Sequence, residues 1–211
     1  MKRNQSRKKK EKKRFRKPVM FVIGEGSYAT ERAYLKHFMS SEYPYCLKFG
    51  NSGGYTDPAQ IFKELHIVFN TMIGDAHEEK DCAFALVDLD CSKEKAEQIR
   101  LLMRKDKKFG MIVSNPCFEV WLIDHFTDQC PQYLNSQQVK KALRDQYLKD
   151  KYPDYKESTD IYPLIADKLD IAICNEEKKQ RKYKDDDSWP NPDHNPRSDM
   201  ADLMKKITGE E

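Results

Sequence analysis

Two short segments of continuous apolar sequence constrain the fold of this 211-residue chain more than any other feature. Residues 19–23 are VMFVI and residues 82–87 are CAFALV, and neither run alternates with polar residues. A strand of this kind is buried on both faces, which is typical of a parallel sheet covered by helices. Residues 46–49 and 111–113 predict two further strands.

Helical periodicity separates the predicted strands, so that strand and helix alternate from residue 19 to residue 126. Thr30 and Glu31 begin one helix, and Asp57-Pro58 caps and starts another. This alternation predicts an α/β domain with a mostly parallel, Rossmann-like sheet. The other segments with helical periodicity are 93–106, 117–126, 136–149, 160–178 and 198–207.

We therefore expect three parts along the chain. Residues 1–17 form a basic disordered tail, residues 18–134 an α/β core, and residues 135–211 a helical extension packed on that core. Charged residues and three prolines are concentrated at about 176–198, which predicts a mobile segment there.

The charge of the chain is unevenly distributed, although its formal net value is only +3. Residues 1–17 hold eleven of the 38 basic residues and one of the 35 acidic residues, so the tail carries +10 and the remainder −7. A basic arm of this kind is typical of a segment that contacts nucleic-acid phosphates without reading sequence. The residues expected to make these contacts are Lys8, Lys9, Lys10, Lys12, Lys13 and Arg14.

Several classes of protein are excluded or disfavoured by the composition. No apolar run approaches the roughly 18 residues of a membrane span, and the N-terminus lacks the apolar region of a secretory signal. None of the six cysteines forms a CxxC pair, which disfavours zinc ribbons and thioredoxin-type redox chemistry. We therefore expect a cytoplasmic protein in a reducing compartment, with no membrane partner.

Acidic residues directly follow both continuous apolar runs. Glu25 comes after the first, between two glycines, and Asp88 and Asp90 come after the second. Ligands of an open parallel sheet bind beyond the carboxyl ends of its strands, and clustered carboxylates there form an oxygen-only site that suits Mg²⁺ or Mn²⁺. The alternative is that Glu25 is an exposed turn residue and that the Asp-Leu-Asp motif is a solvated loop capping the next helix.

A third candidate segment, SNPCFEVWLIDHF at 114–126, places Glu119 in the first turns of an otherwise apolar helix. A carboxylate there is costly unless it is paired or metal-bound, although it would also compensate the helix dipole. His125 is a candidate catalytic residue, but a hydrogen-bonded core histidine is the favoured alternative, and Asn115 would cap the helix. Lys156 lies in an aromatic setting and is either a stabiliser of developing charge or a surface lysine.

The sequence resembles the RloB-like protein family over about 18–207, essentially all of the body. The matching motifs follow the order of the family: Gly24-Glu25-Gly26 with Thr30-Glu31, GGYTDP at 53–58, DLD at 88–90, SNPCFEVWLIDHF at 114–126, DYK at 154–156 and NPRS at 195–198. This chain has one extra residue in the gap between Glu25 and the Thr-Glu pair. RloB-like proteins are regarded as relatives of TOPRIM nucleases in bacterial phage-defence and abortive-infection loci, often with an ABC-type ATPase partner, RloA.

The resemblance implies a TOPRIM-like core and a Mg²⁺- or Mn²⁺-dependent nuclease acting on RNA or DNA. It places Glu25, Asp88 and Asp90 at the metal-binding positions, and we expect Glu119 to be a further ligand or the general base. Glu31 and Asn115 would contact the ligands or a metal-bound water without binding the metal themselves, and Lys156 would stabilise the transition state. The competing hypothesis is a non-enzymatic nucleic-acid-binding adaptor that recruits a partner ATPase through its body.

Overall fold

The computed structural model describes residues 16–74, 78–103 and 108–210. Its five strands are β1 (Val19–Gly24), β2 (Cys46–Phe49), β3 (Cys82–Asp88), β4 (Phe109–Asn115) and β5 (Arg197–Ser198). The longer helices are α1 (Ala29–Leu35), α2 (Pro58–Ile73), α3 (Lys93–Met103), α4 (Glu119–Asp124), α5 (Ser136–Ala142), α7 (Leu169–Arg181) and α8 (Met200–Thr208). Short turns of helix lie at Lys36–Phe38 and α6 (Tyr162–Ile165), and a π-helical stretch, Leu143–Leu148, continues α5.

The strands form one sheet in the order β2-β1-β3-β4-β5. The first four strands of the chain are parallel, and the two-residue β5 pairs antiparallel with β4. Because β1 and β3 are adjacent and in register from Met20 with Cys82 to Gly24 with Leu86, their carboxyl ends lie side by side. The expectation of an α/β fold with a mostly parallel sheet is confirmed.

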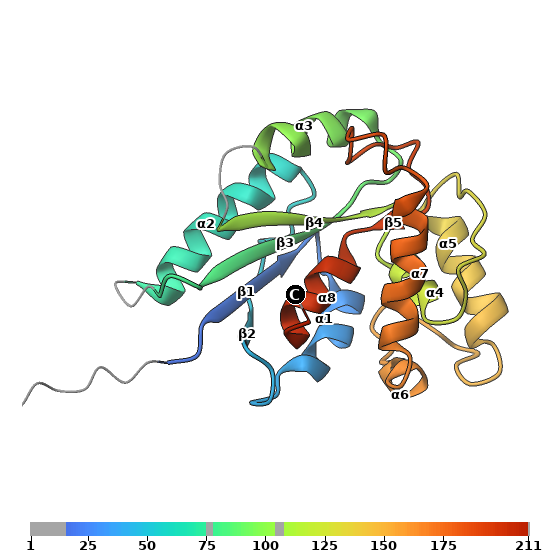
Figure 1. Ribbon diagram of the computed structural model, residues 1–211, viewed down its shortest axis with the longest axis horizontal. Coiled ribbons are helices and arrows are strands. Elements are labelled where there is room, and N and C mark those ends of the chain that lie inside the picture. The colour runs from blue at the N-terminus through green and yellow to red at the C-terminus, as the bar shows by residue number, and fades with distance from the viewer. Residues whose placement is uncertain (1–15, 75–77, 104–107, 211) are drawn as a thin grey trace, which may run out of the picture.

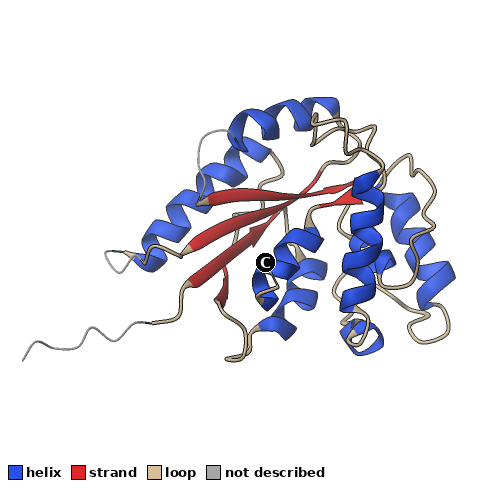
Figure 2. Cartoon of the chain, in the orientation of Figure 1, coloured by secondary structure: helices blue, strands red, loops and turns tan. Residues whose placement is uncertain are grey.

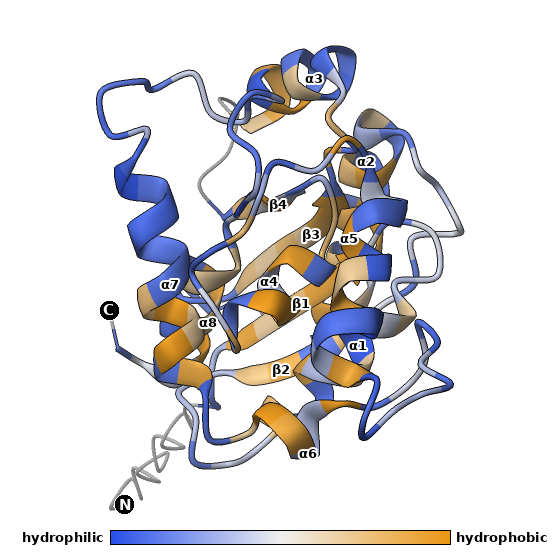
Figure 3. Cartoon of the chain, turned by 90° about the vertical axis from the view of Figure 1, so that its right-hand side faces the viewer, coloured by the Kyte–Doolittle hydropathy of each residue, from blue (hydrophilic) through white to orange (hydrophobic). Residues whose placement is uncertain are grey.

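Helices cover both faces of the sheet (Figures 1 and 2). α2 and α3 pack on one face, where Phe21 and Ile23 of β1 meet Leu65 and Ile99. The opposite face carries α1, α4, α7 and α8, and the hydropathy colouring places α4 among the apolar elements next to the strands (Figure 3). All six residues of β1 are buried, as expected of a strand covered on both faces.

The C-terminal part of the chain completes the sheet and its covering layer. β5 adds the edge strand beside β4, and α7 and α8 pack against α4 and against each other. The segment expected to be one helix over 160–178 is two, because the chain turns between α6 and α7. Residues 135–210 are therefore integrated with the core.

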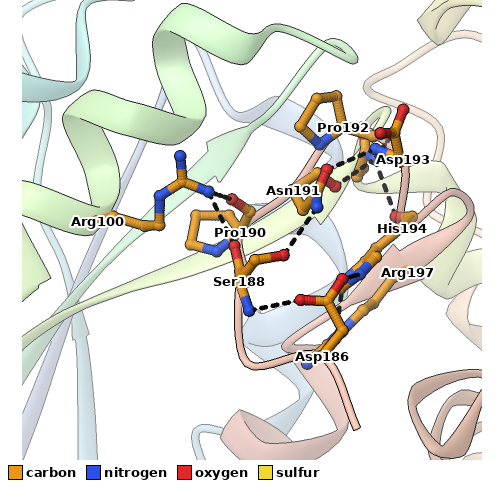
Figure 4. Close-up of polar contacts among 10 residues, drawn as sticks. Arg100, Asp186, Ser188, Pro190, Asn191, Pro192, Asp193, His194 and Arg197 are labelled. Carbon is orange, nitrogen blue, oxygen red and sulfur yellow. Dashed lines mark hydrogen bonds and ion pairs between the residues drawn. The ribbon is translucent and has the colours of Figure 1, made fainter. Parts of the chain in front are cut away.

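Segment 176–198 differs from the mobile connection that the sequence predicts. Residues up to 181 are the end of α7, residues 197–198 are β5, and the chain between them is a loop with many hydrogen bonds (Figure 4). Arg100 of α3 donates to the carbonyl oxygens of Ser188 and Pro190, both at 2.9 Å, and the Asp186 carboxylate lies 2.8 Å from His194 Nε2. The loop is therefore joined to the body through Arg100, although it is rich in charged residues.

The lysines and the arginine of the tail that we expect to contact nucleic acid, residues 8–14, lie outside the described residues. Just beyond them, the Arg16 guanidinium contacts the buried carboxylate of Asp81, with an Nη1–Oδ1 distance of 2.8 Å. The same carboxylate accepts hydrogen bonds from the backbone amides of Val19 and Glu78. These contacts fix the point at which the chain enters β1.

Lys179 of α7 holds the C-terminal layer to the core through a buried ion-pair network. Its Nζ lies 2.8 Å from Asp124 of α4 and 2.6 Å from Glu176, and all three side chains are almost completely buried. Glu176 also accepts the backbone amide of Ser198 in β5. One ammonium group therefore contacts two carboxyl groups that join α4, α7 and the edge strand, and burial raises the pKa of Asp124 well above its usual range.

Replacement of Lys179 by Met should lower the free energy of unfolding by about 3–5 kcal/mol, because it leaves two buried carboxylates without a cation. The neighbouring Lys178→Met is the matched control. Lys178 pairs with Asp128 at the surface, so its loss should change stability by at most about 0.5 kcal/mol. Urea unfolding measures both values, and equal stabilities of the two variants would contradict the role of the network.

Candidate functional site

A small cavity of about 130 Å³ lies beyond the carboxyl ends of β1 and β3, beside the start of α4. Its lining is strongly acidic and includes four carboxylates from four parts of the fold: Glu25, Glu31, Asp88 and Glu119. A fifth, Glu157, and one cation, Lys140, complete the charged lining. The fold thus brings together, in one place, three of the four residues expected to bind metal.

Glu25 follows β1 in a turn that its neighbouring glycines make possible. Gly26 has a φ of 56°, which a residue with a side chain rarely adopts. A Cβ on Gly24 would lie 2.3 Å from the Cβ of Tyr28, so this glycine is required for packing against the protein's own side chain. The Glu25 Oε2 atom accepts a hydrogen bond of 3.2 Å from the backbone amide of Asp88, which links the ends of the two strands.

Asp88 is the last residue of β3, and its half-buried side chain lines the cavity. Its Oδ1 accepts a hydrogen bond of 3.0 Å from the backbone amide of Phe118, just before α4. Burial, followed by repulsion from Glu31, Glu119, Glu25 and Asp90, raises its pKa well above the usual range. An anionic Asp88 is therefore unfavourable unless a cation is near.

Glu119 and Glu31 are the two most buried carboxylates of the cavity. Glu119 begins α4, is 2% exposed, and has a pKa raised by burial against the opposing effect of Lys140. Burial, with added repulsion from Glu119, raises the pKa of Glu31 to about 7. Glu31 lines the cavity directly, whereas the sequence led us to expect it behind the metal ligands.

Asp90 is not part of the cavity lining, so the prediction that both aspartates of the DLD motif enter the site together is corrected. β3 ends at Asp88, and Asp90 has a left-handed backbone with a φ of 53°, so the alternation of a strand does not apply to it. Its Oδ1 accepts a hydrogen bond of 2.7 Å from the Ser136 hydroxyl. Its Oδ2 lies 2.8 Å from Lys95 Nζ.

The ammonium group of Lys95, on α3, bridges the two acidic motifs. It lies 2.9 Å from Glu25 Oε1, 2.8 Å from Asp90 Oδ2 and 3.0 Å from the carbonyl oxygen of Asp88. Desolvation lowers the pKa of Lys95, but the hydrogen bonds and charges of Asp90 and Glu25 outweigh this effect, so the pKa is raised. Lys95 is thus a cation placed between two of the residues expected to bind metal.

Lys140 of α5, and not Lys156, is the lysine of the cavity. Its Nζ lies 3.9 Å from Glu119 Oε1 and forms a closer ion pair with Glu157. The side chain of Lys156 is exposed, and its backbone amide donates to the Thr159 hydroxyl. The structure therefore corrects the placement of Lys156, which is a surface residue outside the lining of the cavity.

His125 and Asn115 are also outside the cavity. His125 is buried in the core, with Nε2 3.2 Å from the Tyr34 hydroxyl and Nδ1 3.0 Å from the carbonyl oxygen of Trp121. Burial lowers its pKa to about 4, so it is a neutral core histidine and not the catalytic residue we considered. Asn115 does not cap α4. Its amide donates to the carbonyl oxygens of Pro192 and His194, and so it anchors the loop of Figure 4.

Sequence reasoning missed Lys95, Lys140 and Glu157. Lys95 lies in a helix rich in both charges, where nothing distinguishes it from Lys93. Lys140 and Lys141 are adjacent in α5, and only the orientation of that helix decides that the first of them reaches the cavity. Glu157 directly follows the DYK motif, so the motif indicated a functional residue in this segment, although Lys156 was the residue predicted.

The chemistry of the donor set fits a hard divalent cation, because the cavity is lined by carboxylate oxygens whose mutual repulsion a cation would relieve. As arranged around Lys95, the described residues form no group of three or more His, Cys, Asp or Glu side chains with metal-binding geometry. A metal bound by both acidic motifs would have to take the place of the Lys95 ammonium.

The fold and the site together define a Rossmann-like α/β protein with an acidic site at the carboxyl edge of its sheet. A family model for RloB-like proteins matches residues 20–207, most of the chain, and the protein belongs to this family. Comparison with curated proteins and with solved structures found no match. Within the described ranges, none of the helices has the length and apolar character needed to cross a membrane.

Replacement of Glu31 by Gln should stabilise the metal-free protein in a pH-dependent way. A carboxyl group with a usual pKa of 4.5 and a folded-state pKa of about 7 makes no unfavourable contribution below pH 4.5, and its penalty grows as the pH rises to about 7. In EDTA, Glu31→Gln should exceed the wild type by about 1–3 kcal/mol at pH 8 and by much less at pH 5. The exposed Glu42→Gln is the control. A gain independent of pH would contradict the assignment.

Proposed function

We propose that this protein is a cytosolic, metal-dependent nuclease of the TOPRIM type that cleaves phosphodiester bonds in RNA or DNA, in a role in antiviral defence. Membership of the RloB-like family supports the class of protein, and all six cysteines are free thiols, in keeping with a reducing compartment. The observation that carries the proposal is the acidic cavity at the ends of β1 and β3, where four carboxylates have raised pKa values.

Structural carboxylates are normally paired, whereas five of them line this small cavity with Lys140, and Lys95 pairs with one more of their oxygens, at Glu25. Such an arrangement is typical of functional sites. Asp88, Glu25 and Glu119 would hold Mg²⁺ or Mn²⁺, with Asp90 joining them once Lys95 is displaced. When bound, the metal would supply charge neutralisation at the scissile phosphate and lower the pKa of a water molecule.

The remaining groups of the cavity would handle the proton and the substrate charge. Glu31 has a pKa of about 7, which is suited to taking a proton from the attacking water near neutral pH. Lys140 keeps its positive charge, because Glu119 and Glu157 raise its pKa against desolvation, and it would contact a phosphate oxygen. The basic residues 8–14 would add phosphate contacts that do not depend on sequence.

The second candidate function is a non-enzymatic nucleic-acid-binding adaptor that recruits an RloA-like ABC-type ATPase. Lys95 favours it, because an internal ammonium already bridges Glu25 and Asp90 and could satisfy them permanently. In that case the acidic edge would be a structural ion-pair cluster, and the basic tail would provide the nucleic-acid contacts.

The purified protein should cleave RNA or DNA in Mg²⁺ or Mn²⁺, and Asp88→Asn should reduce the rate by at least about 100-fold, because it removes one of the carboxylates that would hold the metal. Asp154→Asn changes an exposed acid outside the cavity and should retain the wild-type rate. Gel assays on single-stranded and duplex RNA and DNA measure both variants. Sequencing of cellular RNA and DNA ends after expression identifies the substrate.

Equal cleavage by the wild type and Asp88→Asn would contradict the active-site assignment. Binding of nucleic acid without cleavage in either metal would favour the adaptor. Addition of EDTA to the active protein should abolish cleavage while leaving the contacts of the tail intact.

A further inference from the structure

A second surface feature, a basic groove, runs along the free edge of the sheet. β2 is the first strand in the sheet order and pairs only with β1 among the described strands, so its other edge is open. Two adjoining hollows of about 440 and 710 Å³ follow this edge, and they share Met39, Leu47 and Lys48. We call them together the β2 groove.

The charge of the β2 groove is opposite to that of the acidic cavity. Its lining includes five basic residues and no carboxylate. The basic residues are Arg16, Lys17, Arg32, Lys36 and Lys48. Arg16 pairs with Asp81 and Lys36 with Asp160, whereas Arg32 and Lys48 form no ion pair with any residue in the described ranges.

Apolar and aromatic side chains lie between these cations. Met39 and Met72 are 57% and 52% exposed, which is unusual for methionine side chains. Tyr45 and Phe49 of the same edge are half-buried, and the Arg32 guanidinium lies over the Phe49 ring at 5.8 Å. A groove that combines cations with exposed apolar and aromatic side chains has the composition of single-strand binding surfaces.

The β2 groove also adjoins the acidic cavity. Ser27 and Ala29, at the start of α1, line both the larger hollow and the cavity. A polymer lying along β2 would therefore reach the carboxylates of the candidate active site without crossing the body of the protein.

We propose that the β2 groove binds a single-stranded segment of nucleic acid and directs it into the acidic cavity. Phosphates lie against Arg32 and Lys48, and unpaired bases contact Met39, Tyr45 and Phe49. This inference rests on the proposed function in taking the cavity as the end of the path, and it narrows the substrate to RNA or DNA with an unpaired segment. A duplex hides the faces of its bases, so it would leave the apolar side chains unused.

The test is a binding measurement that does not depend on cleavage. A fluorescein-labelled 15-nucleotide single strand is titrated with full-length protein carrying Asp88→Asn, in EDTA, at several salt concentrations. The added pair Arg32→Ala and Lys48→Ala should weaken binding by roughly tenfold and reduce the slope of log affinity against log salt by about 1.4, since each lost single-strand phosphate contact is worth about 0.7. The pair Lys63→Ala and Lys149→Ala, exposed lysines outside the groove, is the control.

A second pair of variants tests the base contacts. Met39→Ser and Phe49→Ser should weaken binding of the single strand several-fold while leaving the salt slope unchanged, and should leave binding of a blunt duplex unchanged. If both groove pairs bind the single strand as the control pair does, the proposal is overturned, and the tail alone binds the nucleic acid. Two other results would equally overturn the proposal, provided that single-strand binding is unchanged in the groove variants. Loss of binding to a poly-glutamate peptide would assign the groove to an acidic partner, and loss of self-association would assign it to a second copy of the chain.

The two proposals fail separately. Weaker binding in the groove variants of a protein that never cleaves would support the groove and contradict the nuclease. Cleavage that is lost in Asp88→Asn but unaffected in rate and affinity by the groove variants would support the nuclease and contradict the groove.

Discussion

Electrostatic repulsion among buried carboxylates at the carboxyl ends of β1 and β3 is the constraint on which the rest of the site depends. Glu25, Glu31, Asp88 and Glu119 share one small cavity, and burial raises the pKa of each. The parallel pairing of β1 with β3 and the start of α4 hold them there, because Asp88 is hydrogen-bonded to the turn before α4 and to Glu25. Cations are needed to neutralise this negative charge, and Lys95 and Lys140 neutralise part of it.

Under the proposed function, the acidic motifs have two alternative partners, the Lys95 ammonium group and a metal ion. In the structure its ammonium group bridges Glu25 and Asp90, so part of the negative charge is already compensated inside the chain. An external cation, if bound as proposed, would compete with Lys95 for the same oxygens, and a flexible lysine could leave by rotation of its side chain. An enzyme and an adaptor differ in whether this exchange takes place. The basic β2 groove next to the cavity has the charge needed to bring a polyanion towards a site that would otherwise repel it.

The sequence predicted the fold class well and the site in part, for reasons that particular residues make clear. Continuous apolar runs are a strong signal of buried parallel strands, so β1 and β3 were expected, and Glu25 and Asp88 follow from their strand ends. β5 was missed because two residues carry no periodicity, and its pairing depends on a distant strand. Asp90, His125 and Lys156 depended on side-chain direction. The direction of Asp90 depends on a left-handed turn, that of His125 on hydrogen bonds in the core, and that of Lys156 on an exposed loop. The spacing of residues along the sequence predicts none of these three features. Lys95 and Lys140 lie on helices whose rotation only tertiary packing fixes.

The central claim is that the acidic cavity exists to bind a divalent cation, and manganese binding tests it most directly, independently of any substrate. Electron paramagnetic resonance of free Mn²⁺ during titration with the metal-free protein measures the bound fraction. We predict that the wild type removes the free-ion signal at about one or two ions per chain. Asp88→Asn should leave the signal as in protein-free buffer, and Lys95→Met should bind more tightly than the wild type. If the wild type and Asp88→Asn bind Mn²⁺ equally, the account is contradicted, and the carboxylates form a structural cluster neutralised by Lys95 and Lys140.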